Sequence, residues 1–313
     1  MTWLDIANSL LEQEDTRARA SFDRPQMPVT FIFALPRGAS TPFHQLVLSS
    51  MRIGYVSNIM ARFWKAPLFG AQLESDLQTE DYVSNFRSHL GNTTGPLEPH
   101  EWGWFWRHWL RLEGNNHYCT ADAPPDIDEL GRIFASLEAL KSAPLIFDSV
   151  FSMANFNVMR EAIPKVLVAH IIRPPYYVCN SIIKGRLART GDISGFYGHR
   201  PRNIDSLLAI DDPVEQIVLQ VKSILEEMKE DLRTIPSEDV FTVHQDELVL
   251  NYNNIADQYA NFLAGHGVVV TRKPKLSRIP LERRNSPDLI EPAFRNRLNA
   301  HYEKHIGLPP ADT

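Results

Sequence analysis

The chain has 313 residues, of which 43 % are hydrophobic and 22 % are charged, the balance of an ordinary globular protein. Its 32 Lys and Arg against 38 Asp and Glu give a formal net charge of −6, which argues against a general binder of nucleic acid or of anionic membrane surfaces. Two cysteines cannot build a disulfide framework, and no run approaches the roughly 20 apolar residues of a membrane span, so we expect a cytoplasmic protein.

Segments with strand and helix character alternate along the chain. Residues 1–20 read as an acidic amphipathic helix rather than an export signal. Four apolar runs have the length of buried strands: Val29–Leu35, Pro144–Val150, Val166–Ile172 and Val240–His244. Helices are expected from the N-cap Thr41 with Pro42 as first residue, over about Ser152–Ile163, over Tyr177–Ala188, from Asp212-Pro213, and around Ile255–Leu263.

This alternation predicts an α/β fold with a mainly parallel sheet of about four to five strands and helices on both faces. Residues 55–143 fit the alternation less well, and we expect them to form a helical insertion that shapes the acceptor pocket. The whole of residues 1–313 is interpreted as one domain.

The loop Pro36–Thr41 is the first segment that suggests chemistry. A loop from a parallel strand into a helix directs backbone N–H groups toward one point, with the positive end of the helix dipole behind them, so anions bind there. Arg37 adds a permanent charge, and Ser40 and Thr41 add hydroxyl donors. The alternative interpretation is a well-capped helix with a surface arginine.

A second group of residues suggests an anion site at the same sheet edge. Arg173 follows the third strand, and Ser181 lies eight positions later on the next helix. Because ligands of open α/β sheets gather beyond the carboxyl ends of strands, these two side chains are expected to hold one anionic group together. A salt bridge at the strand end is the alternative.

Together these residues resemble the PAPS-dependent sulfotransferases, in particular the bacterial members that act on carbohydrates or small molecules. This family binds 3′-phosphoadenosine 5′-phosphosulfate (PAPS) on a P-loop-like three-layer α/β/α fold. Its motif P-[KR]-[ST]-G-[ST]-[ST] is similar to Pro36–Thr41, which implies that the 5′-phosphosulfate is held by Arg37, Gly38, Ala39, Ser40 and Thr41.

The family's second motif is a strand ending in Arg with Ser eight residues later. His170–Ser181 is similar to it, which implies that Arg173 and Ser181 hold the 3′-phosphate. A weaker likeness covers Val243–Leu248 and Phe262–Gly265.

Three departures from the family pattern bear on cofactor affinity. Ala39 stands where the family has Gly, and its Cβ lies where the backbone approaches the phosphosulfate. Asp148 stands where many relatives carry Lys. The basic loop that closes over the 3′-phosphate in relatives has a loose counterpart in Arg283-Arg284-Asn285.

Sulfuryl transfer needs a base for the acceptor's proton and a cation for the leaving group. Arg37 is expected to supply the cation. For the base we consider a Pro-stiffened turn that contains Glu98, His100 and Glu101, and we favour His100 first and Glu101 second. A solvated polar turn is the alternative. Glu98 is also a candidate for contact with the acceptor.

Further candidates for the acceptor side come from aromatic and histidine residues. In a helix, Trp102, Trp106 and Trp109 share a face that predicts core packing, and Trp104 points elsewhere, where it can stack on an acceptor. Tyr197 and His199 occupy the position of a substrate-lining loop in relatives. His108, His117 and Cys119 show no metal-ligand spacing, so no metal is expected.

Three functions are considered for this sequence. The favoured one is a sulfotransferase that uses PAPS and acts on a hydroxyl or amine of a small-molecule or carbohydrate-like acceptor. The alternative is a sulfotransferase-like protein that binds a nucleotide or partner and has lost catalysis. A nucleotide kinase is disfavoured because the G-x-x-x-x-G-K-[ST] pattern is absent.

Overall fold

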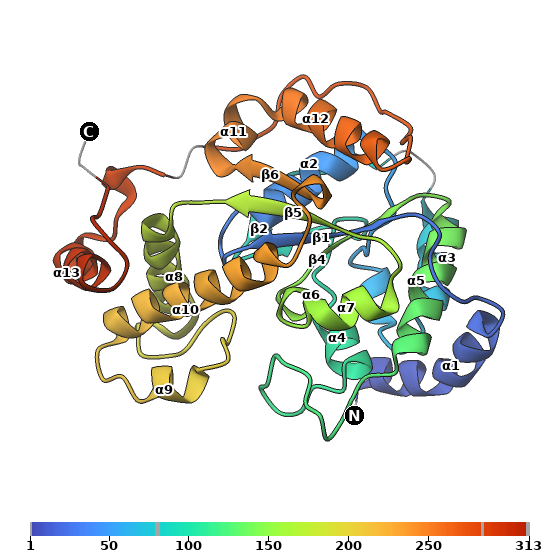
Figure 1. The fold of residues 1–313 in the computed structure, drawn as a ribbon, viewed down its shortest axis with the longest axis horizontal. Helices are drawn as coiled ribbons and strands as arrows, with labels where there is room; N and C mark the ends of the chain where they lie inside the picture. Colours follow the sequence, from blue (N-terminus) through green and yellow to red (C-terminus); the bar gives the residue numbers. More distant parts are fainter. Residues whose placement is uncertain (1, 79–81, 283–284, 311–313) are drawn as a thin grey trace.

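The computed structural model describes residues 2–78, 82–282 and 285–310. Its centre is a four-stranded sheet in the order β4-β1-β5-β6, and every neighbouring pair is parallel (Figure 1). The strands are β1 (Val29–Ala34), β4 (Leu145–Asp148), β5 (Val166–Ile172) and β6 (Val240–His244). All four strands predicted from apolar runs are therefore confirmed, as is the parallel sheet.

Helices cover both faces of this sheet and make the three predicted layers. Successive side chains of β1 point to opposite faces, since a strand alternates with period two. Phe31 and Phe33 pack toward α5 (Ile127–Lys141), α7 (Phe156–Ala162) and α10 (Pro213–Arg233). Ile32 and Ala34 pack toward α2 (Ser40–Ser50) and α12 (Tyr252–Gly265). The sheet is thus buried on both sides, as parallel sheets are.

The remaining elements surround these layers. One of them is α8 (Pro175–Thr190), which follows β5 and carries Ser181. The others are α1 (Trp3–Arg19), α3 (Pro67–Leu77), β2 (Ser88–His89), β3 (Asn92–Thr93), α4 (Gly103–Trp109), α6 (Val150–Ala154), α9 (Ile204–Leu208), α11 (Gln245–Leu250), α13 (Arg295–His305) and four short 3-10 turns.

Two predicted helix boundaries are wrong. Helix α2 begins at Ser40, with Ala39 rather than Thr41 as its N-cap, so Pro42 lies third in the helix, where its missing N–H still costs nothing. The helix expected over residues 152–163 is broken at Asn155 into α6 and α7. The Asn155 side chain bonds to the backbone of His117 and Cys119, so it anchors a distant loop at the break.

The region of residues 55–143 is largely helical in the described part, with α3, α4 and α5. It also contains the hairpin β2–β3, which was not predicted. Leu90 and Gly91, the two residues of its turn, have φ values of 52° and 91°. Two positive φ angles are typical of a type I′ turn, but Leu-Gly lacks the Asn-Gly or Asp-Gly signal by which such turns are recognised.

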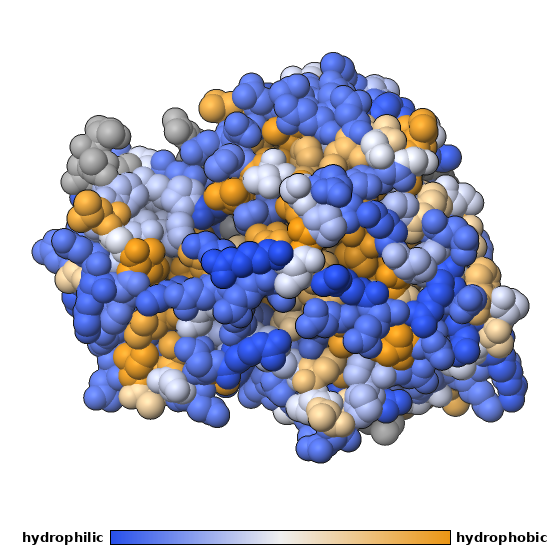
Figure 2. All heavy atoms as spheres, in the orientation of Figure 1, coloured by the Kyte–Doolittle hydropathy of each residue, from blue (hydrophilic) through white to orange (hydrophobic). Residues whose placement is uncertain are grey.

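Hydrophilic residues cover most of the face drawn in Figure 2, and apolar ones emerge in patches between them. Within the described residues, no helix has the length and apolar character needed to cross a bilayer.

Candidate active site

The parallel strands end at one edge of the sheet, and a cavity of about 810 Å³ opens there. Its wall is contributed by the loop after β1, the first turn of α2, the ends of β4 and β5, α8, the β2–β3 hairpin and the loop of residues 196–200. Segments far apart in the sequence therefore meet at the edge where ligands of α/β sheets bind.

The loop after β1 is held in an unusual backbone conformation. Arg37 and Ala39 have φ values of 66° and 77°, a region that costs L-residues roughly 1–2 kcal/mol each. The Gly38 amide between them donates to the Leu35 carbonyl at 2.7 Å, and a Cβ on Gly38 would lie 2.5 Å from that oxygen. Only glycine fits position 38, because this tight turn brings the backbone back on itself.

The turn aims the start of α2 at the cavity. The N-cap Ala39 makes no side-chain cap, so the amides of the first turn, at Ser40 and Thr41, are not covered by a capping side chain. Both residues line the cavity. The positive end of the α2 dipole therefore faces the open space and favours an anion there.

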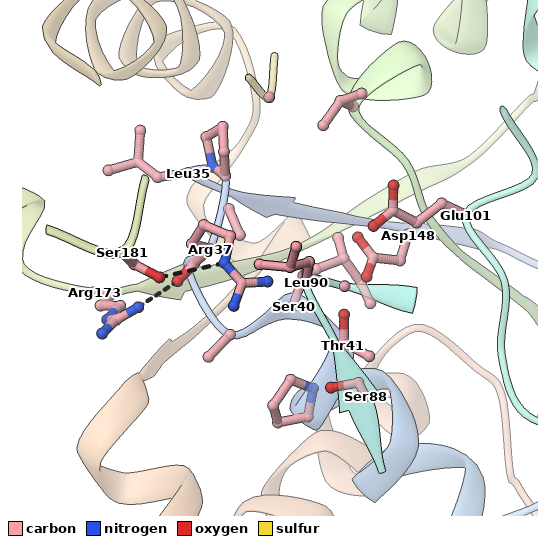
Figure 3. A pocket seen from close by; sticks show the side chains of 18 of the residues that line it. Leu35, Arg37, Ser40, Thr41, Ser88, Leu90, Glu101, Asp148, Arg173 and Ser181 are labelled. Carbon is pink, nitrogen blue, oxygen red and sulfur yellow. Dashed lines mark hydrogen bonds between the residues drawn. The ribbon is translucent and has the colours of Figure 1, made fainter. Parts of the chain in front are cut away.

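The two anion-binding groups predicted from sequence lie together (Figure 3). Arg37 Nε donates to Ser181 Oγ at 3.3 Å. Arg173 Nη1 donates to the Arg37 carbonyl at 2.6 Å, and its Nε donates to Asn285 Oδ1 at 2.9 Å. The guanidinium groups from two neighbouring strand ends and the α8 hydroxyl thus form one connected cluster on the cavity wall.

Two carboxylates, Glu101 and Asp148, lie side by side on the other side of Arg37 (Figure 3). Desolvation raises the pKa of Asp148 well above its usual range, although a hydrogen bond from Ser40 acts in the opposite direction. Desolvation, and then the charge of Asp148, raises the pKa of Glu101, while Arg37 opposes the rise. Glu101 is accessible from the cavity, and because the pKa values of both neighbouring carboxyls are raised, one proton remains on the pair beyond the pH at which ordinary carboxyls ionise.

The hairpin β2–β3 bends over Glu101. A Cβ on Gly91 would lie 3.3 Å from Glu101 Oε1, so the turn approaches the carboxylate closely. Phe86, Ser88 and Leu90 continue this wall of the cavity. The hairpin therefore forms the wall of the cavity beside Glu101.

A pair of histidines lies at the cavity wall: His199 lines the cavity, and His117 contacts His199. His199 Nδ1 lies 3.2 Å from His117 Nδ1, and His199 Nε2 lies 3.1 Å from the Tyr118 hydroxyl, which donates to Glu227. Burial, and then the neighbouring ring, lowers the pKa of His199 to about 3. His199 is therefore neutral at physiological pH and acts as a fixed hydrogen-bonding group. Tyr197, also on the wall, donates to the Leu90 carbonyl at 3.2 Å.

Four of the predicted site residues in the described part of the chain do not line the cavity, and one of them is Gly38, whose amide closes the turn before α2. His100 is exposed, and its Nδ1 accepts from the Trp102 amide at 2.7 Å. Glu98 is buried, where Gln45, Ser84 and the Asn85 amide donate to it. Trp104 is 66 % exposed and lies next to Trp64. By contrast Trp102 and Trp106 are buried in the core, as predicted.

The remaining predicted residues, Arg283 and Arg284, lie outside the described residues. The neighbouring Asn285 contacts Arg173, as described above. Asn285 belongs to the loop Arg283-Arg284-Asn285 that the sequence suggested. Sequence reasoning missed the His117–Tyr118 pair and the hairpin, since each reaches the site through contacts with distant segments that leave no local pattern.

No family model matches this sequence, and no curated protein sequence matches it. Solved structures do: sulfotransferase STF9 from Mycobacterium avium superposes with a TM-score of 0.53 at 11 % identity, over 97 % of this chain and 82 % of that one. Sulfotransferase STF1 from Mycobacterium tuberculosis H37Rv gives 0.49 at 12 %, over 83 % and 73 %. A sulfotransferase from Alicyclobacillus acidocaldarius gives 0.41 at 18 %, over 90 % and 97 %.

At 11 % identity the first of these similarities concerns the fold alone. The chain has a fold shared with a bacterial sulfotransferase, so the resemblance drawn from short motifs is confirmed at the level of the fold.

Proposed function

We propose that the protein is a sulfotransferase that moves the sulfuryl group of PAPS to a hydroxyl or amine of a small-molecule or carbohydrate-like acceptor. The observation that carries the proposal is the meeting of Arg37, Arg173 and Ser181 beside the uncapped start of α2, in a cavity that also holds a carboxylate pair. One half of the cavity suits a multiply charged anion, and the other half suits the removal of a proton.

The residues of the cationic half fit the donor. Arg37 and the amides and hydroxyls of Ser40 and Thr41 would hold the 5′-phosphosulfate, because helix N-termini with a nearby arginine bind such groups. Arg173 and Ser181 would hold the 3′-phosphate. When bound, the donor supplies the sulfuryl group and leaves as 3′,5′-ADP.

Arg37 has a second role in this proposal. It lies between the Arg173–Ser181 pair and the carboxylates (Figure 3). A fixed guanidinium at that position stabilises the negative charge that develops on the leaving phosphate. The same charge favours ionisation of Glu101.

Glu101 is the proposed general base, in preference to His100. Glu101 lines the cavity, whereas His100 is exposed outside its lining and its Nδ1 is occupied by the Trp102 amide. In its ionised form a Glu101 carboxylate oxygen accepts the proton of the acceptor hydroxyl or amine. Desolvation and then the charge of Asp148 raise the pH at which that form is populated, since two adjacent carboxylates do not both ionise readily.

The acceptor side of the proposed site is formed by Phe86, Leu90, Tyr197 and His199. Apolar and aromatic walls with one neutral polar group suit an uncharged ring or chain that carries the reacting hydroxyl or amine.

A screen of acceptors tests the proposal. The protein is incubated with PAPS and separately with phenols, sugars, aliphatic alcohols and amines, and the release of 3′,5′-ADP is followed by chromatography. Release that depends on an acceptor is expected. If the protein binds 3′,5′-ADP but forms none of it from PAPS with any of the four acceptor classes, it is a nucleotide-binding protein without transfer activity.

A further inference from the structure

A cluster of imidazoles and carboxylates lies away from the cavity, where α13 packs against the start of α10. His301 and His305 are four residues apart on α13, so they share one face of the helix. That face meets Glu215 in the first turn of α10 and Asp212 at its N-cap. One nitrogen of each ring and one oxygen of Glu215 all lie within 4.8 Å of one another.

The hydrogen bonds of the cluster orient both rings. His301 Nε2 lies 3.0 Å from Asp212 Oδ2, which turns the other nitrogen, Nδ1, toward Glu215 Oε1 at 3.8 Å. His305 Nε2 lies 2.7 Å from the same Glu215 oxygen. A carboxylate on the far nitrogen of an imidazole is the arrangement that fixes metal-binding histidines in proteins.

We propose that Glu215, His301 and His305 bind a divalent transition-metal ion of the zinc class, with Asp212 as the residue that positions His301. Two imidazoles and one carboxylate are a ligand set that zinc uses, with water in the fourth position. Metal–ligand bonds of about 2.0–2.2 Å require only small side-chain movements from these spacings. The ion would fasten α13 to α10.

The cluster also contains two cations that compete with a metal. Lys304 Nζ donates to Glu215 Oε1 at 2.8 Å, and Arg297 donates to Asp212 Oδ1 at 2.6 Å. The Lys304 side chain is 62 % exposed, so it can turn into solvent when an ion takes its place. Arg297 contacts the Asp212 oxygen that His301 does not use, so it leaves the positioning contact intact.

Such an ion has a structural consequence, because it would add a cross-link between α13 and α10 to the contacts that already hold α13. Leu298 and Tyr302 are its buried side chains, and Tyr176 of α8 adds a hydrogen bond to Asn299. The polar cluster adds contacts between α13 and the start of α10. Metal binding is therefore expected to raise the melting temperature of the full chain.

Calorimetric titration of the chelator-treated full chain with zinc chloride tests the proposal. We expect one equivalent of zinc to bind, and His305→Gln to weaken its affinity about tenfold or more. Asp212→Asn keeps an N-cap oxygen but loses the acceptor for His301, and is expected to weaken zinc binding about 10–100-fold. Lys304→Gln removes the competing cation and is expected to tighten zinc binding.

The matched control is His266→Gln. His266 Nδ1 also lies near a carboxylate, 3.7 Å from Asp239, and the substitution is expected to leave zinc binding unchanged. Absence of stoichiometric binding, or an affinity equal in wild type, His305→Gln and Asp212→Asn, would overturn the proposal. If His305→Gln fails to fold, the opposite effects of Asp212→Asn and Lys304→Gln on zinc affinity decide it.

Discussion

The two halves of the cavity are built in opposite ways. The half around Arg37, Arg173 and Ser181 is cationic, with polar groups fixed at the ends of strands and the start of a helix. The half around Glu101 and Asp148 is acidic, and the turn of a hairpin approaches Glu101 closely. A protein of net charge −6 can thus present a local site for a small anion and keep a proton acceptor beside it.

The largest effect is expected from a substitution in the acidic half, which should lower turnover without changing nucleotide binding in the cationic half. Glu101→Gln removes the proposed base and leaves the cationic cluster unchanged, so turnover with any acceptor found should fall by about 10²–10⁴-fold. Binding of 3′,5′-ADP should remain within a small factor of wild type. His100→Gln is the matched control, and a loss of turnover in that variant comparable to Glu101→Gln would reassign the base.

The second effect concerns the pH range in which the proposed base Glu101 is ionised. Desolvation and the charge of Asp148 raise the pKa of Glu101, so the ionised base appears only as the pH rises. Asp148→Asn removes that charge, and the rising limb of the pH–rate profile should move to lower pH. An unchanged limb would mean that the two carboxylates are not coupled.

The same substitution has a consequence for stability. Because the pKa of Asp148 is higher in the folded chain, the folded state binds more protons than the unfolded one above the usual carboxyl pKa of about 4. This group therefore makes the free energy of unfolding fall as pH rises through that window. Melting curves of Asp148→Asn should lose part of this fall, and a steeper fall would contradict the assignment.

A smaller effect is expected within the cationic half. Ser181→Ala removes one neutral hydroxyl, and about 0.5–1.5 kcal/mol, or roughly 2–10-fold, should be lost from 3′,5′-ADP affinity. Affinity for 5′-ADP, which lacks the 3′-phosphate, should not change. Equal losses for both nucleotides would place Ser181 near the other phosphate.

The smallest effect tests the backbone of the cationic half. Ala39 has a φ of 77°, which glycine adopts without penalty. Ala39→Gly should stabilise the chain by about 0.5–1 kcal/mol after the extra freedom of the unfolded glycine is subtracted. Ala39→Val, which is β-branched, should destabilise it. Thermal melts measure both, and a lower melting temperature for the glycine variant would contradict the argument.

The cationic half was predictable because each of its parts is local. Pro36–Thr41 lies in one strand–loop–helix unit, and Arg173 and Ser181 lie in the next, so apolar runs and turn signals located them. Parallel pairing then brings the two units to one edge. Only the start of α2 was misjudged, because the left-handed conformation of Ala39 begins the helix earlier than a Thr-Pro signal indicates.

The acidic half was predictable only in part, because its geometry depends on long-range contacts. Glu101 and His100 are neighbours in the sequence, and which of them faces the cavity depends on the backbone around Trp102, whose φ is 55°. The hairpin turn at Leu90-Gly91 carries no usual turn signal. The His301–His305 spacing, in contrast, is visible in the sequence and was overlooked.

The most direct test of the central claim is the affinity for 3′,5′-ADP compared with 5′-ADP, measured by calorimetry on wild type and Arg173→Ala. The account predicts tighter binding of 3′,5′-ADP to wild type, by about 10-fold or more, because a charge-assisted contact to the extra phosphate contributes about 1.5–3 kcal/mol. Arg173→Ala should remove the difference. Equal affinities of wild type for the two nucleotides would contradict the account.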